Sequence, residues 1–264
     1  MPYADSDGTS LYYERHGSGP AILFVHGSGG HHAAWWQQVA ALREEFTVVT
    51  VDLRGFGRSD SSMPEFDGQD FPGDVVAVLE AEDLTDVMLV GQSIGSVAAL
   101  RAGLMRPDRV SSVVLGHSLG GIDHPELREL AAADRAEAVK LPVIDRLLTK
   151  AFQTGRPDLT FLFQQMGTFN VARMQDLRNL DTDGPTLDEI RASGVEVAFL
   201  AGEKDAVLGV QTVTRAHELL PGSHLEIVPG APHSMYWETP EPYNAAVARL
   251  RRTLTARPAP EEAV

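Results

Sequence analysis

Short apolar runs rich in β-branched residues alternate with longer alanine-rich segments in the first part of the chain, and this order constrains the fold more than any other feature. The runs are almost continuously apolar, as strands covered on both faces require, and they span residues 21–25, 47–51, 86–90 and 110–115. Segments with helical spacing lie between them at residues 33–44, 73–82 and 95–105. The sequence therefore predicts an α/β fold with a parallel sheet and helices on both faces.

The alternation stops after Leu115 and resumes near residue 195. The intervening stretch has the pattern of successive helices broken by proline and glycine. The later elements are a strand at 195–200, a helix near 207–220, a strand at 225–228 and a helix at 240–255, and a weaker antiparallel edge pair is predicted at 3–6 and 11–16. We therefore predict a core of residues 1–119 and 195–264, a helical cap of residues 120–194, and a frayed tail after Arg257.

Charge and composition exclude several kinds of partner. The chain carries 22 Lys and Arg against 37 Asp and Glu, a net charge of −15, which repels phosphate backbones and anionic lipid surfaces. The chain has no cysteine, so neither a thiol nucleophile nor a thiolate metal site is available. No apolar run approaches the roughly 18 residues of a membrane span, and the first residues lack a secretion signal. We expect a cytoplasmic protein that binds neither nucleic acid nor membranes.

A G-x-S-x-G motif at residues 91–95 supplies the candidate nucleophile, Ser93. It follows a predicted strand and opens a predicted helix, the setting of a nucleophile elbow. The turn is so tight that the residues two before and two after the serine must be small, and it directs the Ile94 amide at a developing oxyanion.

A second G-x-S-x-G match, residues 116–120, also follows a predicted strand. Glycine, aspartate and proline at 121, 123 and 125 would break a helix directly behind it, whereas residues 96–105 continue as an uninterrupted helix. We therefore assign the elbow to Ser93 and expect His117 and Ser118 to lie at a strand end, where they can line a pocket.

A glycine-rich loop at residues 26–30 follows the strand 21–25 and can present backbone N–H groups without side-chain obstruction. We assign the second oxyanion donor to the Ser28 amide. The alternative is a phosphate cradle, which the missing G-x-x-x-x-G-K-[ST] motif and the acidic charge disfavour. His26 is expected to form structural hydrogen bonds under the loop, and His31 and His32 to be solvated or at the pocket rim.

Chain order selects the general base and the acid that orients it. His233 lies in a loop after the last predicted strand, from which it can reach a nucleophile at the same end of the sheet. Asp205 follows the strand 195–200 and is our choice for the acid. Asp123, after the preceding strand, is the alternative, and Glu203 is disfavoured because it lies nearer its strand.

The sequence resembles the α/β-hydrolase fold superfamily from about residue 10 to 255. The shared segments are HGSGG at 26–30, DLRGFGRSD at 52–60, GQSIG at 91–95, RPDRV at 106–110, GEKD at 202–205 and PHSMYWETPE at 232–241. The resemblance implies an eight-stranded, mostly parallel sheet with a helical cap inserted after the sixth strand, and the nucleophile–acid–base order Ser93, Asp205, His233. It also implies a structural role for DLRGFGRSD.

The apolar side chains of the predicted cap could line a pocket facing Ser93 or form the core of the cap. As candidate pocket residues we take His117, Phe161, Phe163, Met166 and Phe169. Arg173 and Arg178 are expected at the surface; either would bind a substrate carboxylate only if it pointed inward.

These residues predict a serine hydrolase that cleaves a carboxylic ester or lactone through an acyl-enzyme, without metal or cofactor. Its partner would be a small apolar or moderately polar ester or lactone. Alternatives on the same residues are C–C bond hydrolysis of the meta-cleavage-product type, which the GQSIG elbow disfavours, and perhydrolysis. A catalytically idle binding protein is the alternative of another class.

Overall fold

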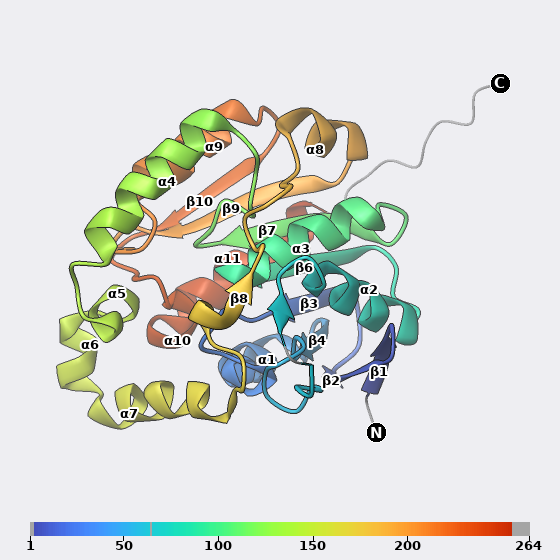
Figure 1. Cartoon of the computed structure of the whole chain (residues 1–264), viewed down its shortest axis with the longest axis horizontal. Helices are drawn as coiled ribbons and strands as arrows, with labels where there is room; N and C mark the ends of the chain where they lie inside the picture. Colours follow the sequence, from blue (N-terminus) through green and yellow to red (C-terminus); the bar gives the residue numbers. More distant parts are fainter. Residues whose placement is uncertain (1–2, 64, 255–264) are drawn as a thin grey trace.

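The fold is built on one large twisted sheet (Figure 1), seen in a computed structural model that describes residues 3–63 and 65–254. Its strands are β1 (Tyr3–Ser6), β2 (Thr9–His16), β3 (Ala21–Val25), β4 (Thr47–Val51), β6 (Val87–Gln92), β7 (Val110–Gly116), β9 (Glu196–Gly202) and β10 (His224–Val228). They lie in the order β1-β2-β4-β3-β6-β7-β9-β10. Only the β1–β2 and β2–β4 pairings in this sheet are antiparallel. The eight-stranded, mostly parallel sheet is therefore confirmed.

Helices cover both faces of the sheet, and the central strand β3 is apolar at every position. In β3, Ile22 and Phe24 pack in one core cluster with residues of α1 (Trp36–Leu42) and α11 (Pro240–Thr253). The alternate residues Leu23 and Val25 belong to a second cluster with residues of α2 (Phe71–Ala81), α3 (Ile94–Met105) and α9 (Val210–Leu219). Burial on both faces explains why the strand carries no polar side chain.

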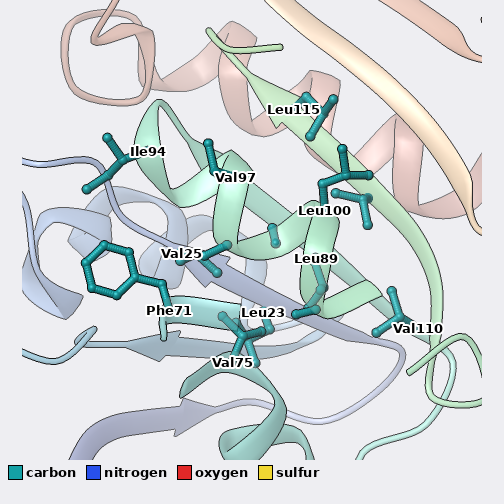
Figure 2. Packing of buried hydrophobic residues seen from close by; sticks show 14 of the residues in the cluster. Leu23, Val25, Phe71, Val75, Leu89, Ile94, Val97, Leu100, Val110 and Leu115 are labelled. Carbon is teal, nitrogen blue, oxygen red and sulfur yellow. The ribbon is translucent and has the colours of Figure 1, made fainter. Parts of the chain in front are cut away.

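The second cluster holds α3, and with it the candidate elbow, against the sheet. Figure 2 shows side chains from α2 and α3 facing those of the strands, among them Phe71, Val97 and Leu23. All three are 3% exposed or less. Burying one side chain of this size contributes about 1.5–3 kcal/mol, so removing a contact here would disturb the position of α3.

The predicted cap, residues 120–194, contains α4 (Pro125–Ala138), α5 (Val143–Leu147), α6 (Lys150–Gly155), α7 (Pro157–Met166) and α8 (Leu187–Ser193). Proline occupies the first position of α4 and α7, where its missing N–H costs no hydrogen bond. Helices α4 to α7, green to yellow in Figure 1, run along one side of the molecule. Much of 167–186 is irregular and holds only two short 3₁₀ turns, η2 (Gly167–Phe169) and η3 (Met174–Asp176), and the two-residue strand β8 (Leu177–Arg178), so the expectation of helices there is wrong.

The sequence did not predict helix α10 (Met235–Glu238) or a two-residue parallel pair of β5 (Phe66–Asp67) with β8 (Leu177–Arg178). The helix predicted at 33–44 begins as a 3₁₀ turn, η1 (His32–Trp35). Elements this short carry no periodic signal. The predicted tail after Arg257 lies outside the described residues. No helix within 3–63 and 65–254 has both the length and the apolar character needed to cross a bilayer.

Candidate active site

Ser93 lies between the end of β6 and the first residue of α3 and has a positive φ of 54°, with ψ −118°. A Cβ at Gly91 would overlap the backbone of Ser96, and one at Gly95 would overlap the carbonyl oxygens of Val25 and His26. The small residues on either side are therefore required by close backbone approach. For a residue other than glycine a positive φ is strained, and such strain is characteristic of functional turns.

The second G-x-S-x-G match is out of register with the end of its strand. β7 ends at Gly116, so His117 takes the turn with φ 55°, and Ser118 lies one position further on. Ser118 Oγ accepts a hydrogen bond from the Gly120 amide at 3.1 Å. Ser93 and His117 thus both have a positive φ directly after a strand, and Ser118 does not.

Loops after β9 and β10 bring Asp205 and His233 together. His233 Nδ1 lies 3.0 Å from both carboxylate oxygens of Asp205. The other two candidate acids lie elsewhere: Asp123 is ion-paired with Arg128 at an exposed site, and Glu203 is exposed and accepts the Gly230 amide at 2.8 Å. The geometry therefore favours Asp205 as the partner of His233.

The Asp205 side chain is only 1% exposed, yet its carboxyl is held ionised. Burial opposes ionisation, but the charge of His233 and hydrogen bonds from His117 and His233 outweigh it and hold the pKa of Asp205 well below its usual range. The amides of Val207 and Leu208 also donate to Oδ1, at 2.8 and 3.1 Å. A carboxylate bound in this way can orient an imidazole and stabilise imidazolium.

Ser93 and His233 line the same cavity, of about 290 Å³. Within the described residues, Ser93 Oγ and His233 are not hydrogen-bonded to each other. Such contacts are often long in the absence of substrate and shorten in the reacting complex. The cavity thus places a hydroxyl and an imidazole that is oriented by a carboxylate around one space.

The candidate oxyanion donors border this space. Ser28 lines the cavity, and Ile94 is the first residue of α3, where the amide has no acceptor within the helix. His26 supports the loop as expected: its Nδ1 donates to the Gly27 carbonyl at 2.8 Å, and its Nε2 accepts the Leu53 amide at 3.2 Å. Burial lowers the pKa of His26 to about 4, so this ring is neutral.

A larger cavity of about 590 Å³ borders Ser93 on another side. Apolar side chains of the core and of α4 line part of it, including Val97, Ile122 and Leu127, and a charged group that includes Arg128 and Asp181 lines the rest. Ser93 therefore borders both cavities.

Only some of the five predicted pocket residues line the two cavities beside Ser93. Phe163 lines the smaller cavity and His117 the larger one. Met166 packs against the core and lines neither of these cavities. Phe161 and Phe169 are 63% and 70% exposed and line neither cavity, so the prediction that they face Ser93 is wrong.

Two side chains that support the site were not predicted. Gln92, the variable residue of the elbow motif, donates from Nε2 to the carbonyl of His233 at 2.9 Å. Asn170, in the predicted cap, donates to the Gly30 carbonyl and accepts the Gly57 amide, each at 3.0 Å. Both join segments more than a hundred residues apart, and no local pattern marks such a contact.

The remaining predicted residues have structural surroundings. His32 Nδ1 lies 2.8 Å from the buried Asp52, whose carboxylate also accepts the Arg58 amide at 2.9 Å, so the expected role for this segment holds. His31 is buried, and His32 is largely so, which corrects the expectation that they are solvated or at the rim. Arg173 and Arg178 are exposed, as expected.

Two groups of potential metal ligands occur in the described part of the chain, His31–His32–Asp52 and His117–Asp205–His233. In both, imidazole nitrogens lie 2.8–3.0 Å from carboxylate oxygens. Zinc would instead lie about 2.0–2.2 Å from each of its ligand atoms. Direct contacts between the ligand atoms fit hydrogen-bonded clusters.

Comparison with known proteins agrees with this architecture. The model of the alpha/beta hydrolase fold family matches residues 20–240. An uncharacterized protein of Mycobacterium tuberculosis is 28% identical over 262 residues, which cover 90% of this chain and 76% of the relative. A thermophilic esterase from Thermogutta terrifontis superposes with a TM-score of 0.79 at 23% identity, covering 96% of this chain and 98% of its own. An enol-lactonase from Burkholderia xenovorans LB400 does so with a TM-score of 0.74 at 21% identity, covering 96% and 100%. The chain belongs to the α/β-hydrolase fold family.

Proposed function

We propose that the protein is a serine hydrolase that cleaves a carboxylic ester or lactone through an acyl-enzyme on Ser93. The observation that carries the proposal is that an elbow serine and a histidine bound to a buried carboxylate line one cavity beside a glycine-rich loop. Two structures of this fold are described as an esterase and an enol-lactonase, in keeping with ester cleavage.

In the proposed reaction, His233 Nε2 takes the proton of the Ser93 hydroxyl as Oγ attacks the carbonyl carbon. The amides of Ser28 and Ile94 donate to the oxyanion, and Asp205 stabilises the imidazolium. Nε2 then gives the proton to the departing alcohol oxygen. Water repeats the sequence on the acyl-enzyme with His233 again as base, which releases the acid and restores Ser93. Each step uses side chains and amides of this chain.

The two cavities beside Ser93 favour a substrate with two unequal arms. The smaller cavity, bordered by Phe163 and Leu147, suits a short apolar group, and the larger one holds a longer group with an apolar inner part and a polar end. We further propose that residues 120–194 act as a cap over this site, and that the protein works in the cytoplasm on a small molecule.

Labelling and turnover by two serine variants test this proposal. Ser93→Ala should abolish labelling by a fluorophosphonate probe and turnover of p-nitrophenyl esters of graded acyl length. Ser118→Ala is the matched control and should keep most of both, because Ser118 is not in the elbow conformation. EDTA should change neither the labelling rate nor the turnover rate of the wild-type protein. Full labelling of the folded Ser93→Ala protein, or loss of activity on chelation, would reject the mechanism.

A substrate panel distinguishes the alternatives. It should contain the esters, several lactones and a vinylogous diketone acid, assayed at equal concentration. Turnover of the diketone acid alone would move the function to C–C bond hydrolysis. Probe labelling together with turnover of no substrate would leave a reactive serine without the proposed specificity, and a wild-type protein that is not labelled would be an idle member of the fold.

A further inference from the structure

A second histidine contacts the Asp205 carboxylate. His117 Nδ1 lies 2.9 Å from Oδ2, and His233 Nδ1 lies 3.0 Å from the same atom. The two imidazole rings meet edge to face, with centroids 5.4 Å apart. The proposed mechanism uses only His233, so the contact between His117 and Asp205 has no role in it.

Burial and hydrogen bonding determine the protonation of His117. An ionised carboxylate only accepts hydrogen bonds, so the proton lies on His117 Nδ1. The side chain is 0% exposed, and burial lowers the pKa of His117 in spite of the opposing effect of Asp205. His117 Nε2 is buried and has no hydrogen-bond partner in the described residues, so a proton there would lack an acceptor. The ring is therefore a neutral donor with Nδ1–H.

The backbone holds this donor rigidly at the end of β7. The His117 amide donates to the Leu200 carbonyl of β9 at 2.9 Å, and the residue has φ 55°. Asp205, from the loop after β9, and His233, from the loop after β10, are the titratable groups that act on it. The carboxylate oxygen Oδ2 thus accepts one hydrogen bond from each histidine. Oδ1 accepts hydrogen bonds from the amides of Val207 and Leu208.

We propose that His117 is a positioning residue that fixes the Asp205 carboxylate and, by sharing its negative charge, lowers the pH at which His233 becomes free to act as a base. The proposal rests on the function assigned above. Without His117, Oδ2 would interact with His233 alone. The carboxylate would then hold the His233 proton more strongly. The acid limb of the activity profile would move to higher pH.

Two substitutions at His117 separate the donor from the mere presence of a side chain. His117→Asn can place an amide N–H where Nδ1 lies, and asparagine tolerates positive φ. His117→Ala removes the donor. The rate of Ser93 labelling by a fluorophosphonate probe is measured from pH 5 to 9, because this readout does not depend on the natural substrate.

We expect the labelling midpoint of His117→Ala to rise by roughly half to one pH unit, and that of His117→Asn to stay close to the wild-type value. An unchanged midpoint in the alanine variant would overturn the proposal. Equal shifts in both variants would do so as well, because the donor would then be irrelevant. Loss of labelling at every pH in both folded variants would make His117 the base itself.

Imidazole ¹⁵N spectra of the wild-type protein provide a test that does not require the alanine variant to fold. The signal missing from His117→Asn identifies His117. At pH 7 it should show a protonated Nδ1 and an unprotonated Nε2. A doubly protonated ring at pH 7 or an Nε2–H tautomer would overturn the proposal. Failure of the wild-type protein to react with the probe would reject the hydrolase function instead, while this spectrum still decides the state of His117.

Discussion

Ser93 and His117 show how much a single backbone position decides. Both are the first residue after a parallel strand, both have φ near 55°, and their amides donate to carbonyls of the next strand, Gly116 and Leu200. One position presents a hydroxyl beside two cavities, and the other presents an imidazole to Asp205. The same local geometry therefore supplies a candidate nucleophile at one strand and a support for the acid at the next.

The role of Asp205 can be separated from that of the nearest alternative acid. Asp205→Asn should lower kcat of the best ester by about 10³–10⁴-fold, because the amide cannot stabilise the imidazolium and favours the wrong tautomer. Asp123→Asn is the control, since its carboxylate pairs with Arg128 and does not contact His233. Steady-state kinetics on both variants provide the measurement, and the reverse ranking would move the acid to Asp123.

His26 should make stability depend on pH. Its pKa is about 4 in the folded protein, against 6.5 for an ordinary histidine, so between these values the unfolded chain binds a proton that the folded chain does not. The stabilisation that His26 provides is therefore fully present above pH 6.5 and decreases as the pH falls toward 4. Between pH 7 and pH 5 the protein should lose about 2 kcal/mol of its free energy of unfolding through this group.

Urea unfolding at pH 7 and pH 5 tests this expectation. His26→Gln should be less stable than the wild type at pH 7, because buried hydrogen bonds are lost, by about 1–3 kcal/mol. Between pH 7 and pH 5 the variant should lose less free energy of unfolding than the wild-type protein, and the difference should be about 2 kcal/mol. Equal losses in the two proteins would show that His26 is not the group responsible.

At the scale of elements, the close approach of α3 to β3 brings the two candidate oxyanion donors near each other. Gly95 touches the carbonyl oxygens at the end of β3 and in the loop that follows, so the first turn of the helix lies against the glycine-rich loop. Gly27, in the glycine-rich loop, lies close to Ser93, because a Cβ added at Gly27 would be 3.4 Å from the Cβ of Ser93. The geometry of the site therefore depends on how one helix packs on one strand.

Two glycine-to-alanine changes in helices test this dependence. Gly95→Ala should destabilise the protein by about 3 kcal/mol or more and abolish probe labelling, because the new Cβ overlaps backbone oxygens. Gly73→Ala, in α2, meets only Ser6 Oγ at 3.7 Å and should stabilise by about 0.5–1 kcal/mol with labelling unchanged. Thermal and urea unfolding measure both. A tolerated Gly95→Ala would contradict the packing argument.

At the scale of the whole molecule, the predicted cap contacts the core at the site. Asn170 joins the loop of Gly30 to the loop of Gly57, and a Cβ at Gly167 would lie 3.3 Å from the Gly29 carbonyl oxygen. The segment after α7 therefore packs on the glycine-rich loop. Residues of α5 and α7 line the smaller cavity.

Asn170→Ala should therefore reduce activity from a distance. Loss of its two hydrogen bonds frees the glycine-rich loop, and we expect kcat/KM to fall by roughly tenfold, with a stability loss of about 1–3 kcal/mol. Gln153→Ala is the matched control, because the Gln153 side chain donates to Asp145 and to the Leu148 carbonyl, both within the predicted cap. Activity equal to that of the control would show that this contact does not position the loop.

The sequence by itself determined the strands of the large sheet, the helices that follow its central strands, and the position of the elbow. Strands 21–25 and 47–51 have the predicted limits, and helix α3 begins within one residue of its predicted start. Hydrophobic period, proline and glycine act over a few neighbouring residues, so they can be read locally. The choice of Ser93 over Ser118 was also local, because it depended on the residues directly behind each turn.

Only the tertiary structure decided which distant residues meet. His117 and Asp205 are 88 residues apart, and Asn170 and Gly30 are 140 apart; their contacts depend on how the strands are ordered and where each ends. The exposure of Phe161 and Phe169 likewise depends on how residues 120–194 pack, because an apolar side chain has the same local signal whether it faces a cavity or solvent. The candidate reacting groups can therefore be identified from short stretches of sequence, whereas their burial and hydrogen bonds depend on contacts between distant segments.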